Sequence, residues 1–189
     1  MSDNIFNSKH LHKLNNPERF REVPPDYIWK ELNLKAPQVA VDIGAGTGFF
    51  TKEFLRKMPK GKIYACDISE TMLNWMKKNI VPENPNIIPL KMAHDTLPCE
   101  NGIADLVYMI NLHHEIENHE RLLNEIYRVL KPSGKLFIVD WKKQVMEHGP
   151  PIQIRFELDE VKSQLETAGF NRVDLNDSFP NHFFVIAEK

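Results

Sequence analysis

Cysteine is scarce in this chain of 189 residues, which contains only Cys66 and Cys99 and has no CxxC pair. A fold stapled by several disulfides is therefore excluded, and the pattern is typical of a protein from a reducing compartment. We predict that both thiols are reduced, that Cys66 lies in the core and that the protein is cytoplasmic.

Long apolar runs are missing as well. No stretch of the sequence approaches the roughly 18 apolar residues that a membrane span requires. The first residues are polar and lack the apolar centre of a signal peptide. We therefore expect a protein with no membrane span.

An excess of positive charge is also lacking. Lysine and arginine together number 24, against 26 aspartate and glutamate residues, so the formal net charge is −2. Proteins that bind nucleic acid mainly by neutralising phosphates need a basic surface, and no Asn-Pro-Pro-Tyr/Phe base pocket is present. We expect no nucleic-acid partner. A Gly-Lys-Ser/Thr sequence is absent too, which excludes a P-loop.

A glycine-rich turn is the most informative feature that is present. A β-branched run from Val39 to Ile43 precedes glycines at positions 44, 46 and 48, and an apolar helical pattern follows. This order predicts a strand, a tight turn and a helix N-terminus, as in a nucleotide-binding βαβ unit. Asp67 ends the next predicted strand, where an acid accepts hydrogen bonds from ribose hydroxyls. Phe49 replaces the third glycine of a dinucleotide-binding loop and argues against a nicotinamide cofactor.

Strands and helices alternate along the rest of the chain, which predicts a doubly wound α/β sheet in a single domain, residues 1–189. The last two strands are joined by a link too short for a helix and should pair antiparallel, and Pro89 places its strand at an edge. Residues 1–36 are predicted to be a helical arm, either a mobile or packing segment or a lid with Phe20 and Tyr27 as its apolar contacts, and residues 37–189 the core. Later strands are predicted at 62–66, 86–92, 104–110, 136–139, 172–175 and 183–187.

Ligands bind such sheets outside the carboxyl ends of the strands. The candidate site residues are therefore those that follow the predicted strands: 42–48, 67, 93–97, 111–115 and 140–142.

Several of these segments together resemble the class I S-adenosylmethionine-dependent methyltransferases. Residues 41–48 (VDIGAGTG) are similar to the first motif of that family, and Asp67 to its ribose acid. Residues 105–107 (DLV), 112–114 (LHH) and 128–134 (RVLKPSG) resemble its small-molecule, UbiE-like branch. The resemblance implies a seven-stranded Rossmann-like sheet of order 3-2-1-4-5-7-6, with S-adenosylmethionine as cofactor and S-adenosylhomocysteine as product.

The resemblance also implies roles for individual residues. Asp42 and the backbone of the turn would hold the methionine moiety, Asp67 both ribose hydroxyls, and Ile68 would pack on the adenine. Ala93 stands where the family usually has an adenine-binding Asp, so Asp95 or a backbone carbonyl takes that role, or Asp95 is an ordinary loop acid. The implied cofactor-binding residues are Asp42, Gly44, Ala45, Gly46, Thr47, Gly48, Asp67, Ile68, His94, Asp95 and Asn111.

The implied reaction is methyl transfer to an unidentified small molecule by in-line displacement, in which a base is needed only if the acceptor must lose a proton. His114 or Glu115 is the nearest candidate base, although His113 and His114 also resemble family residues that often only pack and cap below the acceptor pocket. A metal site is not expected, because adjacent residues do not easily converge on one ion. Two alternatives are a cofactor-binding module without its own catalysis and a nicotinamide-dependent oxidoreductase. We expect a monomer or a homodimer.

Overall fold

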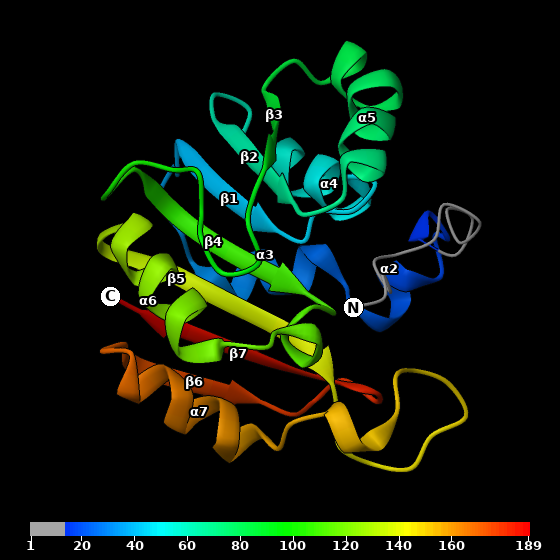
Figure 1. Ribbon diagram of the computed structural model, residues 1–189, viewed down its shortest axis with the longest axis vertical. Helices are drawn as coiled ribbons and strands as arrows, with labels where there is room; N and C mark the ends of the chain where they lie inside the picture. The colour runs from blue at the N-terminus through cyan, green and yellow to red at the C-terminus, as the bar shows by residue number, and fades with distance from the viewer. Residues whose placement is uncertain (1–13) are drawn as a thin grey trace.

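The computed structural model describes residues 14–189, which form one seven-stranded sheet of order β3-β2-β1-β4-β5-β7-β6 (Figure 1). Strand β7 runs antiparallel to both β5 and β6, and the other neighbouring pairs are parallel. The predicted sheet order and the antiparallel C-terminal pair are thereby confirmed. The strands are β1 (Val39–Ile43), β2 (Lys62–Asp67), β3 (Ile87–Lys91), β4 (Ala104–Ile110), β5 (Leu130–Trp141), β6 (Asn171–Asn176) and β7 (His182–Glu188).

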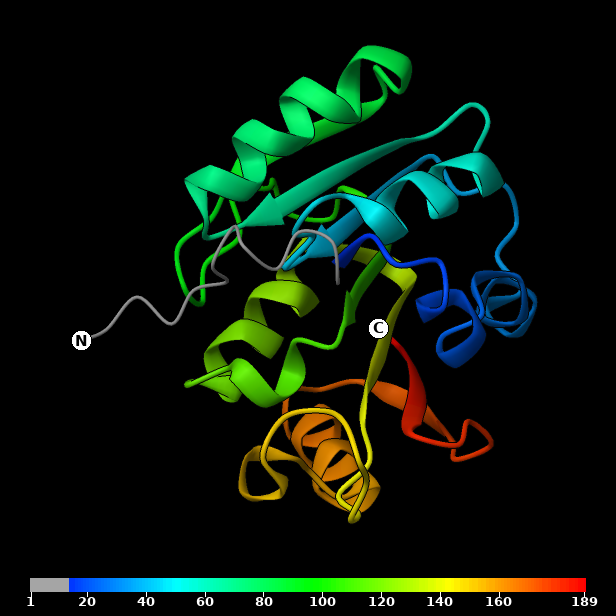
Figure 2. The ribbon, with the colours of Figure 1, turned by 90° about the vertical axis from the view of Figure 1, so that its right-hand side faces the viewer.

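Helices cover both faces of the sheet (Figures 1 and 2). Helices α3, α4 and α5 pack on one face, and α6 and α7 pack on the other. The α-helices are α2 (Arg19–Glu22), α3 (Pro25–Leu32), α4 (Phe49–Lys57), α5 (Glu70–Asn79), α6 (His119–Val129) and α7 (Leu158–Thr167). Short 3₁₀ turns are η2 (Val81–Glu83), η3 (His113–Glu115) and η4 (Ile152–Ile154).

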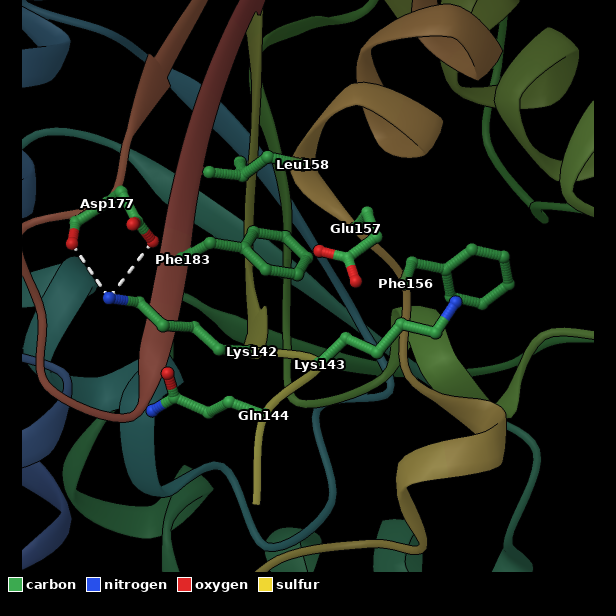
Figure 3. Close-up of a pocket in the computed structure, with 8 residues that line it drawn as sticks. All are labelled: Lys142, Lys143, Gln144, Phe156, Glu157, Leu158, Asp177 and Phe183. Atoms are coloured by element: carbon green, nitrogen blue, oxygen red, sulfur yellow. Dashed lines mark hydrogen bonds and ion pairs between the residues drawn. The ribbon is translucent and has the colours of Figure 1, made fainter. Parts of the chain in front are cut away.

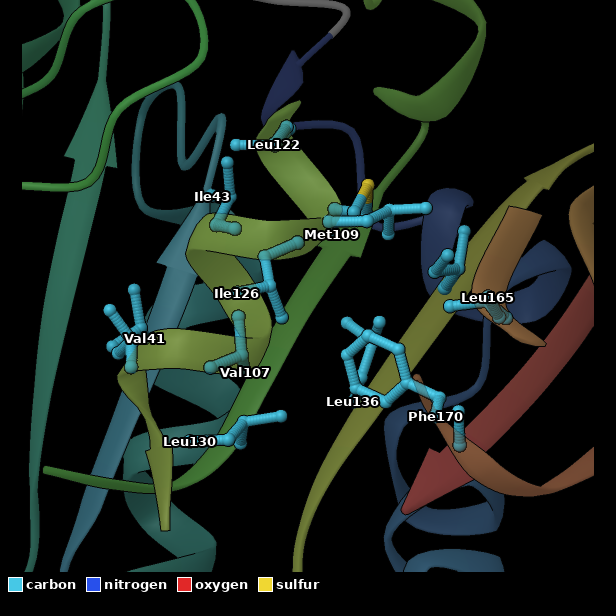
Figure 4. Close-up of a cluster of buried hydrophobic side chains, with 14 of the residues drawn as sticks. Val41, Ile43, Val107, Met109, Leu122, Ile126, Leu130, Leu136, Leu165 and Phe170 are labelled. Carbon is cyan, nitrogen blue, oxygen red and sulfur yellow. The ribbon is translucent and has the colours of Figure 1, made fainter. Parts of the chain in front are cut away.

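The core lies on both sides of the central strands, because successive strand residues point to opposite faces. Val107 of β4 joins Ile126 of α6 and Leu165 of α7 on one side (Figure 4). Tyr108, one residue on, stacks on Phe137 of β5 on the other side, with ring centroids 4.9 Å apart. A fully covered sheet explains why β1 and β4 are apolar at all positions except Asp42 and Asp105. Cys66 is buried, and Cys66 and Cys99 are free thiols, as predicted.

Strand β5 begins earlier than predicted, at Leu130 instead of Leu136. Helix α6 does end at Val129, before the Lys-Pro-Ser-Gly sequence. That sequence does not leave the sheet, because the β4–β5 register shifts between Ala104 and Leu106 and absorbs the extra residues as an irregular bulge. The predicted start of β5 is wrong because proline and glycine predict an interruption of the strand, which the bulge instead accommodates.

The two edges of the sheet are irregular strands. Strand β3 forms one edge and contains Pro89, opposite Ala65 of β2, as predicted. Strand β6 forms the other edge, where its pairing with β7 shifts between Asn171 and Asp174 and Arg172 has a positive φ of 49°.

The N-terminal arm packs through α3, in which Ile28 and Leu32 are fully buried. Pro25 occupies the first turn of this helix, where its missing N–H costs nothing. The short helix α2 lies within the arm that the sequence predicts to be helical, but its position at residues 19–22 was not predicted. His10 and His12, which the polar sequence around them predicts to be solvated, lie outside the described residues. Within residues 14–189, no helix is long and apolar enough to cross a membrane.

Candidate active site

The turn between β1 and α4 has the backbone that its glycines predict. Gly44, Gly46 and Gly48 have φ angles of 68°, 55° and 75°, in the left-handed region that favours glycine. A Cβ atom at Gly44 would lie 2.8 Å from the Leu112 side chain, whereas one at Gly46 would meet nothing closer than 4.0 Å. The atoms at that distance are the Gly44 carbonyl oxygen and a Leu14 methyl carbon, so the Gly46 main chain is not crowded. An uncrowded main chain at the carboxyl end of a parallel strand fits a ligand that approaches it.

Asp67 fixes the turn from the neighbouring strand. Its side chain accepts hydrogen bonds from the Gly46 N–H at Oδ2 and from the Ser69 N–H at Oδ1, both at 2.7 Å. Asp67 is buried, and burial raises its pKa. Each carboxylate oxygen retains a further lone pair, so these bonds are compatible with the predicted contact to ribose hydroxyls. Ile68 follows at the same edge and is half-buried.

Asp42 lies beneath the turn. Its Oδ2 accepts a hydrogen bond of 2.6 Å from the Thr51 hydroxyl of α4, and the residue is only 3% exposed. Burial raises the pKa of Asp42 to about 7, against the opposing effect of the Thr51 hydrogen bond. The carboxyl group therefore ties β1 to α4, and the Gly48 N–H closes the turn above it by donating to the Ala45 carbonyl at 2.9 Å.

The remaining predicted cofactor residues lie on two loops. Asn111 follows β4 with a φ of 55°, and its side-chain Oδ1 is buried without a hydrogen-bond partner in the described chain. An orphaned buried acceptor marks a place for a water or a ligand donor. On the β3–β4 loop, His94 is exposed and Asp95 pairs with Arg121 of α6 at 3.4 Å.

His114 and Asp140 form a buried pair where β4 and β5 end. The Nδ1–H of His114 donates to Asp140 Oδ1 at 2.7 Å, and the His114 backbone N–H donates to Oδ2 at 2.9 Å. Their side chains are 7% and 2% exposed. The Nε2 atom of His114 lies 3.6 Å from Glu115 Oε1. Sequence reasoning placed Asp140 at the edge but missed this pairing.

His113 is a packing residue, one of the two readings left open by the sequence. Its imidazole is fully buried, donates from Nε2 to the Gln164 side chain at 2.8 Å and packs edge-on against Phe156. Burial lowers the pKa of His113 to about 4. Among residues 14–189, no group of three potential ligands could hold a metal ion.

The crossover from β5 to α7 is held by Arg155, which sequence reasoning also missed. Its guanidinium donates from Nε to the Pro150 carbonyl at 2.8 Å and from Nη1 to the Gln144 and Lys142 carbonyls at 3.0 and 3.1 Å. A cavity of about 150 Å³ opens beside this crossover, with Phe156 and Phe183 on its walls (Figure 3).

The N-terminal arm lies against the glycine turn. The Thr47 hydroxyl donates to Asn15 Oδ1 at 3.0 Å, and Phe20 stacks on Phe49 with ring centroids 4.3 Å apart. Arg19 lies over the Phe50 ring, 4.8 Å from its centroid, and burial lowers the pKa of Arg19 to about 10. Tyr27 points elsewhere, toward Phe179 in the β6–β7 loop.

The strand order, the glycine turn and the acid at the end of β2 define the Rossmann-like architecture of class I S-adenosylmethionine-dependent methyltransferases. The chain belongs to the family described as "Methyltransferase domain", whose model matches residues 41–138. S-adenosylmethionine is the cofactor of this family, and the protein is a methyltransferase.

Individual relatives agree with this assignment. A crystal structure described as a SAM-dependent methyltransferase from Aquifex aeolicus shares 32% identity, covers 97% of this chain and 98% of its own, and superposes with a TM-score of 0.89. An uncharacterised methyltransferase-like protein of Schizosaccharomyces pombe is 35% identical over 60% of this chain, and the match spans only 42% of that protein. The ubiquinone/menaquinone biosynthesis C-methyltransferase UbiE of Escherichia fergusonii is 24% identical, over 78% of this chain and 74% of its own.

Proposed function

We propose that the protein transfers the methyl group to a small molecule bound between the glycine turn and the end of β5. Bound S-adenosylmethionine supplies a methyl group already activated on sulfur. The chain must align the acceptor with that methyl group and exclude water, which are proximity and desolvation effects. The observation behind this proposal is the packing of Leu112 against Gly44, which sets His114 and Glu115 beside the turn.

We assign cofactor binding to the residues predicted from the resemblance. The backbone from Gly44 to Gly48 offers the uncrowded main chain of Gly46, and Asp67 offers carboxylate lone pairs. Asn111 offers an acceptor without a partner. Asp42 acts from beneath by fixing the turn. Ile68, His94 and Asp95 complete the proposed adenine side.

A small acceptor is supported by the relatives. The name of UbiE, a ubiquinone/menaquinone biosynthesis C-methyltransferase, places it in the synthesis of small molecules. We further propose a cytoplasmic location, no nucleic-acid partner, and a monomer or homodimer.

The test is calorimetric binding of S-adenosylmethionine and S-adenosylhomocysteine, followed by a metabolite screen that measures S-adenosylhomocysteine release. Asp67→Asn should weaken cofactor binding at least about tenfold, because hydrogen bonds to a charged group are lost. Asp174→Asn, on the exposed edge strand β6, is the matched control and should bind normally. Binding without turnover across the screen would favour a cofactor-binding module. A thermal shift with NAD alone would favour an oxidoreductase.

A further inference from the structure

Asp140 is a buried carboxylate whose hydrogen-bond donors are the ring and backbone of His114 and the backbone N–H of Trp141. Oδ1 accepts from His114 Nδ1–H and from the Trp141 backbone N–H, both at 2.7 Å, and Oδ2 accepts from the His114 backbone N–H. Among the ion pairs of residues 14–189, His114 is the partner of Asp140, and no lysine or arginine shares it. The imidazole of His114 is therefore the side chain that the Asp140 carboxylate binds.

This arrangement selects one tautomer of His114. A carboxylate accepts and cannot donate, so the proton of the neutral ring resides on Nδ1, and Nε2 carries a lone pair. The same hydrogen bond fixes the orientation of the ring and so the direction of that lone pair. Neighbouring His113 has no such partner, because its Nε2 binds the amide side chain of Gln164. The two adjacent histidines thus have different environments and different uses.

Nε2 of His114 faces a route to solvent. Glu115 Oε1 lies 3.6 Å away, too far for a hydrogen bond but close enough to receive a proton after a small rotation, and the Glu115 side chain is 54% exposed. Partial desolvation raises the pKa of Glu115, helped by the charges of Asp140 and Asp67 and opposed by His114.

We propose that Asp140 is a positioning residue for His114, and that the methyl acceptor is a protic nucleophile X–H whose proton His114 removes. This inference rests on the proposed methyl-transfer function. The acceptor atom X forms a bond to the methyl carbon as the carbon–sulfur bond breaks. Sulfur keeps the electron pair of that bond and becomes a neutral thioether. The X–H proton passes to Nε2 of His114 and then to Glu115 and solvent. Tertiary amines and thioethers, which have no proton to lose, are outside this acceptor class.

The first experiment is the metabolite screen with wild-type protein saturated with S-adenosylmethionine, followed by identification of the methylated atom. Every hit should be methylated at an atom that carried a hydrogen. On the best hit, His114→Gln and Asp140→Asn should each lower kcat by about 10²–10⁴-fold. The KM for the cofactor and the Kd for S-adenosylhomocysteine should change less than about threefold. Added imidazole should restore part of the activity of His114→Gly, which a purely structural histidine would not permit.

Asp105→Asn is the matched control for Asp140→Asn. Asp105 also accepts from two backbone amides, those of Gln38 and Val39, but at the amino end of β4. The Asp105→Asn variant should be less stable than wild type but should have the same kcat. Methylation of a tertiary amine or thioether, or a His114→Gln kcat within threefold of wild type, would overturn the inference.

A second measurement needs no acceptor and decides the matter if the screen yields no hit. Nitrogen-15 NMR of the protein saturated with S-adenosylhomocysteine reports which ring nitrogen of His114 bears the proton. The Nδ1–H tautomer supports the inference, and the Nε2–H tautomer contradicts it. Failure of wild-type protein to bind S-adenosylhomocysteine would instead contradict the proposed function, so the two failures are distinguishable.

Discussion

His182 occupies the first position of β7 and packs against Trp141, with ring centroids 4.2 Å apart and ring planes tilted by 40°. Both of its ring nitrogens are buried without partners among residues 14–189. Burial lowers its pKa to about 4, from an ordinary value of 6.5. The imidazole is therefore neutral in the folded state, whereas the unfolded chain takes up a proton near pH 6.5. Between these two values the unfolded state binds more protons, so stability falls as pH falls.

The substitution His182→Phe removes the buried titratable group, and with it this pH dependence of stability, while keeping an aromatic ring at the position. We expect the variant to be at least as stable as wild type at pH 7, because an unsatisfied buried polar group is lost. Wild type should lose about 2 kcal/mol more than the variant between pH 7 and pH 5. Urea unfolding at both pH values measures this difference. Exposed His148→Gln is the control and should follow wild type, and equal pH dependence in wild type and His182→Phe would contradict the prediction.

Gly46 and Gly102 allow a second comparison at the level of single residues. Both have positive φ angles, of 55° and 61°, and neither would place a Cβ closer than 4.0 Å to another heavy atom. Each alanine substitution should cost about 1–2 kcal/mol of stability from the left-handed backbone alone. Only Gly46→Ala should also weaken S-adenosylmethionine binding, by about tenfold or more, because its methyl group enters the ligand space. Calorimetry on both variants checks this, and equal affinities would contradict the proposed site.

Residues whose role is local could be predicted from the sequence, and residues whose role depends on register could not. The glycines and Asp67 are recognisable because turn geometry and strand ends follow directly from neighbouring residues. The bond between His114 and Asp140 joins two strand ends that only the β4–β5 pairing brings together. His182 meets Trp141 for the same reason, through β5–β7 register.

Among the elements, the crossover between β5 and α7 depends on one side chain. Arg155 is 6% exposed, and its guanidinium binds carbonyls on both arms of the loop. Hydrogen bonds from a charged donor contribute about 1.5–3 kcal/mol, so their loss should release the loop. Arg155→Met keeps the apolar stem and removes these donors.

We expect hydrogen exchange in residues 142–151 to accelerate at least about tenfold in Arg155→Met, with α6 unchanged. Mass spectrometry of deuterium uptake measures this. Arg56→Met, at an exposed ion pair on α4, is the control and should leave the loop as it is in wild type. Unchanged exchange in Arg155→Met would show that other contacts hold the crossover.

Most helices and strands were predictable because their apolar residues recur with a clear period and because proline, glycine or a capping residue marks their ends. The antiparallel pair β6–β7 followed from the short link between the strands, and the edge position of β3 from Pro89. The early start of β5 and the position of α2 within the arm were not predictable. The first depends on a bulge formed with β4, and the second on Phe20 and Arg19 packing against α4.

At the scale of the whole molecule, α3 of the arm is part of the main core. Leu32 of α3 and Ile126 of α6 are both fully buried, on opposite faces of the sheet. Each substitution to alanine should lower the free energy of unfolding by about 2–5 kcal/mol. Because the helices on both faces pack against the same sheet, unfolding should remain a single transition.

Trp29 in α3 can be observed alone when Trp75 and Trp141 are replaced by Phe. Its fluorescence should therefore change with the same urea midpoint as the circular dichroism signal. The coincidence should persist in Leu32→Ala and Ile126→Ala. An earlier fluorescence transition in Leu32→Ala alone would mean that the arm is a separate unit.

The irregular outer strands bear on how copies of this chain can associate. A straight, unpaired strand is a template on which a second molecule can continue the sheet. Pro89 removes a donor from one edge, and the register shift near Arg172 distorts the other. Concentrated solutions of the folded protein should therefore resist fibril growth by edge-to-edge stacking. Any homodimer should form through helices or loops, and no strand of one subunit should pair with a strand of the other.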